Sequence, residues 1–250
     1  MQASGEGKEA LLVAHGSPAD PAPQEAVMMA LAVRVAMWLP GWQVRGATLA
    51  SSGSLDQAVS RMRAPLVYPF FMAQGWFTRT TLPKRLEAAG ATGLHQLAPF
   101  GTDPALPRLM VQAARAGAQA GGLDPGRTCL LIAAHGSKVS RTSADSTWAM
   151  VDQLREKAGF ASVQAGFVEE APFLAETATG LGRAICLPFF ALSAGHVVDD
   201  VPDALAQAGF DGILLPPIGE NVGVAPLIAT ALLQAHRRDA PTASAGADAT

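Results

Sequence analysis

The stretch LLIAAHGS at Leu130–Ser137 decides the fold, because it also occurs near the start of the chain as LLVAHGS at Leu11–Ser17. Two further pairs of segments follow in the same order. They are VYPFF and CLPFF, at Val67–Phe71 and Cys186–Phe190, and LAPFG and LPPIG, at Leu97–Gly101 and Leu215–Gly219. His15 and His135 lie 120 positions apart, and the later pairs keep nearly this spacing. Three collinear matches indicate an internal duplication of one domain.

Each half alternates short apolar runs of strand length with longer segments of helical pattern. The expected strands are Ala10–Ala14, Gln43–Leu49, Leu66–Tyr68, Gly93–Leu97, Cys129–Ala134, Val163–Val168, Ala184–Leu187 and Gly212–Leu215. The expected helices include Gln24–Trp38, Leu106–Ala120, Ser146–Ala158, Val201–Ala208 and Val224–His236. Apolar strands separated by helices are typical of parallel sheets covered on both faces. We therefore expect an α/β protein with two similar doubly wound, flavodoxin-like domains.

A segment rich in Gly and Pro, Ala120–Arg127, marks the expected boundary between the halves. This places an N-terminal domain at residues 1–122 and a C-terminal domain at residues 123–238. The remaining residues, Asp239–Thr250, are small and polar, which predicts a disordered tail.

The composition excludes several classes of protein. Hydrophobic residues make up 49% of the 250 residues and charged residues 16%, which is enough apolar material for a sizeable core. The net charge of -3 gives no basic field for nucleic acid or an anionic membrane. No apolar run could span a bilayer, and the first residues do not resemble a signal peptide, so we expect a cytoplasmic protein. Cys129 and Cys186 lie in apolar runs and are expected to act as small buried hydrophobic residues.

Polar side chains follow three expected strands of the second half, at the edge where parallel sheets bind ligands. His135 follows the first strand, and Glu169 and Glu170 follow the second. His196 and Asp200 follow the third. Two imidazoles and a carboxylate suit a divalent ion such as cobalt, iron, nickel or zinc and leave coordination positions open. The alternative is that each histidine only forms hydrogen bonds at a strand end.

Other kinds of site have weaker support. A helix after the turn at Gly136-Ser137 could bind a phosphate. However, the chain has neither of the glycine-rich motifs that usually bind nucleotides. Ser137 is not in the G-x-S-x-G setting of a hydrolase nucleophile.

Three motifs carry a resemblance to a known family. They are AHGS at Ala134–Ser137, F-x-E at Phe167–Glu169, and PFFALSAGHVVDDVP at Pro188–Pro202, which matches P-x-F-L-x-x-G-x-H-x-x-x-D-[IV]-P. The chain resembles the class II chelatases of the sirohydrochlorin type, the cobaltochelatases and ferrochelatases of cobalamin and siroheme synthesis. The resemblance covers both halves. Ala191 and Ala194 replace the family's Leu and Gly, and neither change touches a ligand.

The resemblance implies insertion of a divalent metal, cobalt or iron with nickel or zinc as alternatives, into sirohydrochlorin or a related tetrapyrrole. It implies no nucleotide and no redox cofactor. His135 and His196 would hold the metal, while Glu169 would bind it or accept pyrrole protons, with Glu170 as the next candidate. Asp200 would orient His196 from a second shell. The alternative is that Asp199 or Asp200 caps the helix that follows, which begins with Val201-Pro202.

The first half has lost this constellation. Aligned on the second half at an offset of 119 residues, Phe77 stands at the position of His196, Ala50 at that of Glu169, and Thr81 at that of Asp200. His15 alone remains, opposite His135. We therefore expect the chemistry in the second half.

The expected substrate contacts lie in both halves. Trp76 and Phe77 would stack on the macrocycle, or else simply pack between the lobes. Cations near the site would bind substrate carboxylates, unless they are only solvated surface charges. These cations are Lys138, Arg141 and Arg79. His15 and Ser137, on the two AHGS turns, are the remaining expected substrate contacts. A monomer or a homodimer would suffice. A tetrapyrrole or metal carrier without turnover is the alternative function.

Overall fold

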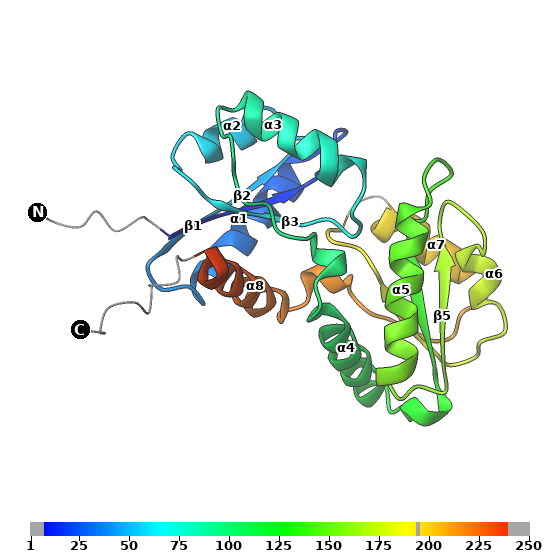
Figure 1. The fold of residues 1–250 in the computed structure, drawn as a ribbon. Helices are drawn as coiled ribbons and strands as arrows, with labels where there is room; N and C mark the ends of the chain where they lie inside the picture. Colours follow the sequence, from blue (N-terminus) through cyan, green and yellow to red (C-terminus); the bar gives the residue numbers. More distant parts are fainter. Residues whose placement is uncertain (1–7, 194–195, 240–250) are drawn as a thin grey trace, which may run out of the picture.

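The computed structural model describes residues 8–193 and 196–239, without the side chains of residues 196 and 197, and shows two lobes (Figure 1). The sheet of the first lobe has the parallel order β2-β1-β3, and that of the second has the order β5-β4-β6-β7. Their bounds are β1 Lys8–Ala14, β2 Trp42–Thr48, β3 Leu66–Pro69, β4 Cys129–Ala134, β5 Ser162–Phe167, β6 Ile185–Pro188 and β7 Ile213–Leu214. The two-domain α/β fold class is thereby confirmed.

Helices cover the faces of both sheets. The α-helices of the described residues are α1 Pro21–Ala36, α2 Ser54–Val59, α3 Leu82–Ala88, α4 Leu106–Ala120, α5 Thr142–Lys157, α6 Leu174–Ala178, α7 Val201–Gln207 and α8 Val224–Asp239. Short π-helical turns at Phe77–Thr81 and His196–Asp200 lead into α3 and α7. None of the described helices is long and apolar enough to cross a membrane.

Two local predictions are corrected. The strand expected at Gly93–Leu97 is reduced to one bridge between Gln96 and Val67. Gly93 turns with a φ of 66°, and Pro99 has no N–H to donate, so only a short extended piece fits between them. Asp239, assigned to the tail, is the last residue of α8. The rest of the predicted tail lies outside the described residues.

The last helix of each half packs on the other lobe (Figure 1). Helix α4 contacts α5 and β6 of the second lobe, while α8 contacts α1 and β3 of the first. Arg115 of α4 donates through Nε to the carbonyl of Ala158 at 2.9 Å, and Trp42 meets His236 of α8 edge to face at 5.3 Å. Each half of the sequence alone would therefore leave one sheet face uncovered.

The glycines of the LAPFG and LPPIG repeats allow a close approach of backbone. The N–H of Gly101 donates to the carbonyl of Phe71 at 2.9 Å, and that of Gly219 to the carbonyl of Phe190 at 3.0 Å. A Cβ at either position would lie 1.9 Å from a carbonyl oxygen, that of Met72 or of Ala191. Any larger residue would push away the loops that follow β3 and β6. Those loops border the cleft between the lobes.

Cys186 is buried and Cys129 is half-buried, and both are free thiols. Burial raises the pKa of the Cys186 thiol well above its usual value. This environment suits a small core residue, as predicted for Cys186.

A buried polar pair joins β3 to the segment before α4. The hydroxyl of Tyr68 donates to Asp103 Oδ2 at 3.0 Å, and the N–H of Ala105 donates to Asp103 Oδ1 at 2.9 Å. Burial raises the pKa of Asp103, although both hydrogen bonds oppose this shift. Because the folded pKa lies above the unfolded one, the stability contributed by Asp103 is full below its unfolded pKa. It is lost as the pH rises through the folded pKa.

We expect Tyr68→Phe to steepen this loss of stability with pH. The variant removes a donor to a buried carboxylate, which costs about 1.5–3 kcal/mol when the acceptor is charged and less when it is neutral. Urea unfolding at pH 3.5, below the ordinary carboxyl pKa, and at pH 8 would measure the free energy of unfolding. The difference between variant and wild type should be larger at pH 8. If the variant and the wild type differed by the same free energy of unfolding at both pH values, ionisation of Asp103 would not be the cause of the pH dependence.

Candidate functional site

A cleft of about 670 Å³ lies between the lobes, at the carboxyl ends of both sheets. Its walls are mainly apolar, and they include Phe70, Phe71 and Met72 of the first lobe and Phe190, Ala191 and Leu192 of the second. His15 and His135, the histidines of the two AHGS turns, both line it. The duplication thus places equivalent strand ends on opposite sides of one cavity. Its volume is within the range of small-molecule sites.

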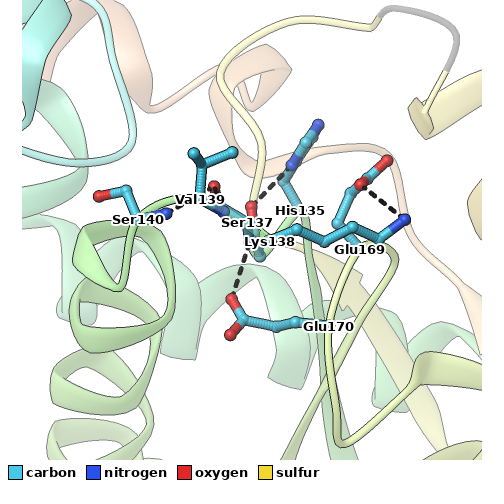
Figure 2. A network of polar contacts seen from close by, with 8 residues as sticks. His135, Ser137, Lys138, Val139, Ser140, Glu169 and Glu170 are labelled. Atoms are coloured by element: carbon cyan, nitrogen blue, oxygen red, sulfur yellow. Dashed lines mark hydrogen bonds and ion pairs between the residues drawn. The ribbon is translucent and has the colours of Figure 1, made fainter.

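His135 follows β4 and is half-buried. Its Nδ1 lies 2.8 Å from the carbonyl oxygen of Gly136 (Figure 2). Because a carbonyl can only accept, Nδ1 carries the hydrogen, and in the neutral ring the lone pair is on Nε2. The ring is therefore oriented by the turn, as metal-binding imidazoles usually are. Gly136 permits the turn with a φ of 72°.

The two carboxylates after β5 point in different directions (Figure 2). Glu170 turns beneath the AHGS turn, where its Oε1 accepts from the N–H of Ser137 at 2.7 Å. Glu169 lies on the same side as the His135 ring, and its N–H donates to the His135 carbonyl at 2.9 Å. Lys138 Nζ lies 3.5 Å from Glu169 Oε2. Glu169 therefore adjoins His135 but lines the neighbouring cavity beside α6 and α7 rather than the cleft itself, while Glu170 supports the turn.

His196 begins the π-helical turn before α7, but its side chain lies outside the described part of the chain. Among the described side chains no three His, Cys, Asp or Glu residues gather as metal ligands. Asp200 ends the same turn and borders both the cleft and a neighbouring cavity beside Glu169. The capping alternative for Asp200 is wrong, because its backbone is already helical and it makes no side-chain cap to α7.

Aromatic residues stand where the first half lost its metal ligands. The Phe77 ring contacts the His15 ring at a centroid distance of 4.2 Å, and it stacks with Phe71 at 6.5 Å. Trp76 meets Phe77 edge to face at 5.2 Å and is 65% exposed. His15 and Phe71 line the cleft, so Phe77 contacts two residues of its lining, while Trp76 contacts Phe77; neither ring is itself among the lining residues.

Three of the predicted substrate contacts have other partners or lie elsewhere. Arg79 donates to Gln74 Oε1 at 3.3 Å and lines a different pocket, beside α3, so the structure does not bring it to the cleft lining. The hydroxyl of Ser137 accepts the N–H groups of Val139 and Ser140, both at 3.2 Å, and thereby shapes the turn. Arg141 is exposed at the start of α5.

Gln24 and Asp199 also line the cleft, which was not predicted for either residue from the sequence. Gln24, in the first turn of α1, donates through Nε2 to the carbonyl of Ser193 at 3.3 Å. It thus ties the first lobe to the loop before His196. Nothing in the sequence separates Gln24 from an ordinary polar residue of a helix, whereas Asp199 adjoins a residue that was singled out.

The hydrogen bonds support an alignment of the halves in which the AHGS turns are offset by 120 residues and the later segments by 119. Ala50 donates to the carbonyl of His15 at 2.9 Å, as Glu169 does to that of His135. Phe77 begins the first π-helical turn, as His196 begins the second. The first lobe therefore keeps the backbone of the site and lacks its carboxylate and second histidine.

Two duplicated parallel-sheet lobes, with histidines at equivalent strand ends facing one cleft, define a chelatase-like α/β protein. The CbiX family model matches residues 9–116 and 129–238. The chain belongs to this family.

Similar proteins agree with this assignment. A solved structure described as CbiX, the terminal enzyme for biosynthesis of siroheme in denitrifying bacteria, is 48% identical; the match covers 91% of this chain and 99% of that one, with a TM-score of 0.84. A probable sirohydrochlorin cobaltochelatase of Halobacterium salinarum is 24% identical, over 64% of this chain and 64% of its own length. SirB from Bacillus subtilis with Fe³⁺ is 17% identical, covers 94% of this chain and 96% of its own, and shares the fold with a TM-score of 0.68.

Proposed function

We propose that this protein inserts a divalent metal ion, Co²⁺ or Fe²⁺, into sirohydrochlorin or a related tetrapyrrole. The observation that carries the proposal is the placement of His135 and Glu169 on adjoining strand ends, His135 in the interlobe cleft and Glu169 in the neighbouring cavity that shares Asp200 with it. The names of the relatives, which mention sirohydrochlorin, siroheme, cobalt and iron, support the same reaction. The compartment is the cytoplasm, and the working unit is a monomer or a homodimer.

In the proposed reaction the free-base ring loses two N–H protons as the divalent ion enters, so charge is balanced without ATP or a redox cofactor. His135, through Nε2, and His196 coordinate the ion as neutral imidazoles. Glu169 completes the ligand set or accepts a pyrrole proton and passes it to water. Asp200 orients His196. The apolar walls and the neighbouring Trp76–Phe77 pair contact the flat macrocycle.

The donor set does not select one metal, because imidazole and carboxylate ligands accept cobalt, iron, nickel and zinc. Turnover should be measured with each of these four ions and with sirohydrochlorin or other free-base tetrapyrroles, followed by the absorbance change of the metallated ring. The proposal expects turnover with Co²⁺ or Fe²⁺ in the absence of ATP. Tetrapyrrole binding without metallation by any ion would identify a carrier and overturn the enzymatic proposal.

A further inference from the structure

Lys138 forms an ion pair with the carboxylate of the candidate site. Its Nζ lies 3.5 Å from Glu169 Oε2, and the two side chains are 73% and 32% exposed (Figure 2). The backbone around Lys138 is fixed, because Glu170 accepts from the N–H of Ser137 and the Ser137 hydroxyl accepts from the two residues after Lys138. The backbone of Lys138 is therefore held in place, while its exposed side chain can move the ammonium group.

Both members of this pair are missing together from the first half. Pro18 stands at the position of Lys138 at the 120-residue offset of the two AHGS turns, and Ala50 at that of Glu169 at the 119-residue offset of the segments that follow. The turn itself is present in both halves, with positive φ angles at Gly16 and Gly136. The lysine is therefore not needed to form the turn. It occurs in the half that has the carboxylate and is absent from the half that lacks it.

An ammonium beside a carboxylate competes with any metal ion that approaches the same oxygens, because like charges at this distance repel each other. We propose that Lys138 is a place-holding cation. It neutralises Glu169 until a divalent ion displaces it, and it then pairs with a carboxylate of the tetrapyrrole. This inference rests on the proposed function and assigns Lys138 a part in the order of binding, as a positioning residue.

The exchange couples the two substrates. When the metal displaces the ammonium, Lys138 becomes available to the acidic macrocycle. Conversely, a macrocycle carboxylate that binds Lys138 uncovers Glu169. By thermodynamic linkage each substrate then raises the affinity of the other by the same factor. Without the lysine, the metal should bind more tightly when no tetrapyrrole is present. The effect of each substrate on the affinity of the other should become smaller.

The test measures Co²⁺ binding without tetrapyrrole, by calorimetry, for Lys138→Met and the matched variant Lys157→Met. Lys157 is an exposed lysine near Gln153 at the other end of α5, about 24 Å of helix away. Removing one positive charge near a divalent ion strengthens the binding of that ion, and salt screens part of the effect. Lys138→Met should therefore lower the Co²⁺ Kd about fivefold. Lys157→Met should leave the Kd unchanged. The same Lys138→Met variant should show a raised KM for the tetrapyrrole.

A double-mutant cycle isolates the pair. In a Glu169→Gln background the expected effect of Lys138→Met on the Co²⁺ Kd disappears. If wild type inserts metal but Lys138→Met binds Co²⁺ no more tightly than Lys157→Met, the place-holding role is refuted and the proposed function stands. If wild type neither binds Co²⁺ nor turns over, the proposed function falls, and the inference falls with it.

Discussion

His135→Ala is expected to lower metal insertion by more than about a hundredfold, because losing even an outer-shell partner of a metal ligand typically costs about 10–100-fold. His135 lines the cleft, and its bond to Gly136 already orients the ring for coordination through Nε2. We expect an effect of the same size for His196→Ala. Absorbance assays would measure turnover, and circular dichroism would verify that each variant is folded.

His15→Ala is the matched control for this prediction. His15 stands at the equivalent strand end and lines the same cleft, but its neighbours are Phe77 and Ala50 where the second lobe has a histidine and a glutamate. We therefore expect only a few-fold loss, from changed contact with the macrocycle. If His15→Ala abolished metal insertion and His196→Ala left it unchanged, the active site would have to be assigned to the first lobe.

The repeat was sufficient to predict two parallel-sheet lobes, because apolar strand runs and their order are local features of the sequence. It did not predict the exchange of α4 and α8 between lobes. The buried face of α4, which includes Leu106, Met110 and Ala114, shows that the helix packs on something. An amphipathic pattern does not say which of two similar sheets receives it, since both offer the same kind of apolar surface.

The site was predictable to the level of strand ends and no further. The rule that ligands bind where parallel strands end pointed to His135 and to the pair Glu169 and Glu170. The choice between the two acids depends on where Ser137 presents its N–H, which only the folded turn determines. The position of the Arg79 side chain was not predictable for a similar reason, because a motif fixes the position of a residue and not the direction of a long side chain.

Glu169→Gln is the second change with a large expected effect. Glutamine keeps the shape of the side chain but can neither carry the negative charge nor accept a pyrrole proton. General-base groups typically contribute about 10²–10⁴-fold, so we expect kcat to fall by at least about a hundredfold. Stopped assays with Co²⁺ and Fe²⁺ at saturating tetrapyrrole would measure this directly.

Glu170→Gln provides the control, because it makes the same chemical change at the next residue. Its Oε1 can still accept from the N–H of Ser137, so the turn that carries His135 should persist, at a cost of about 1 kcal/mol for replacing a charged acceptor. Turnover should stay within a few-fold of wild type. If Glu170→Gln were inactive and Glu169→Gln active, the proton acceptor would be the acid beneath the turn. The AHGS turn would then have to open during the reaction for that acid to reach the macrocycle.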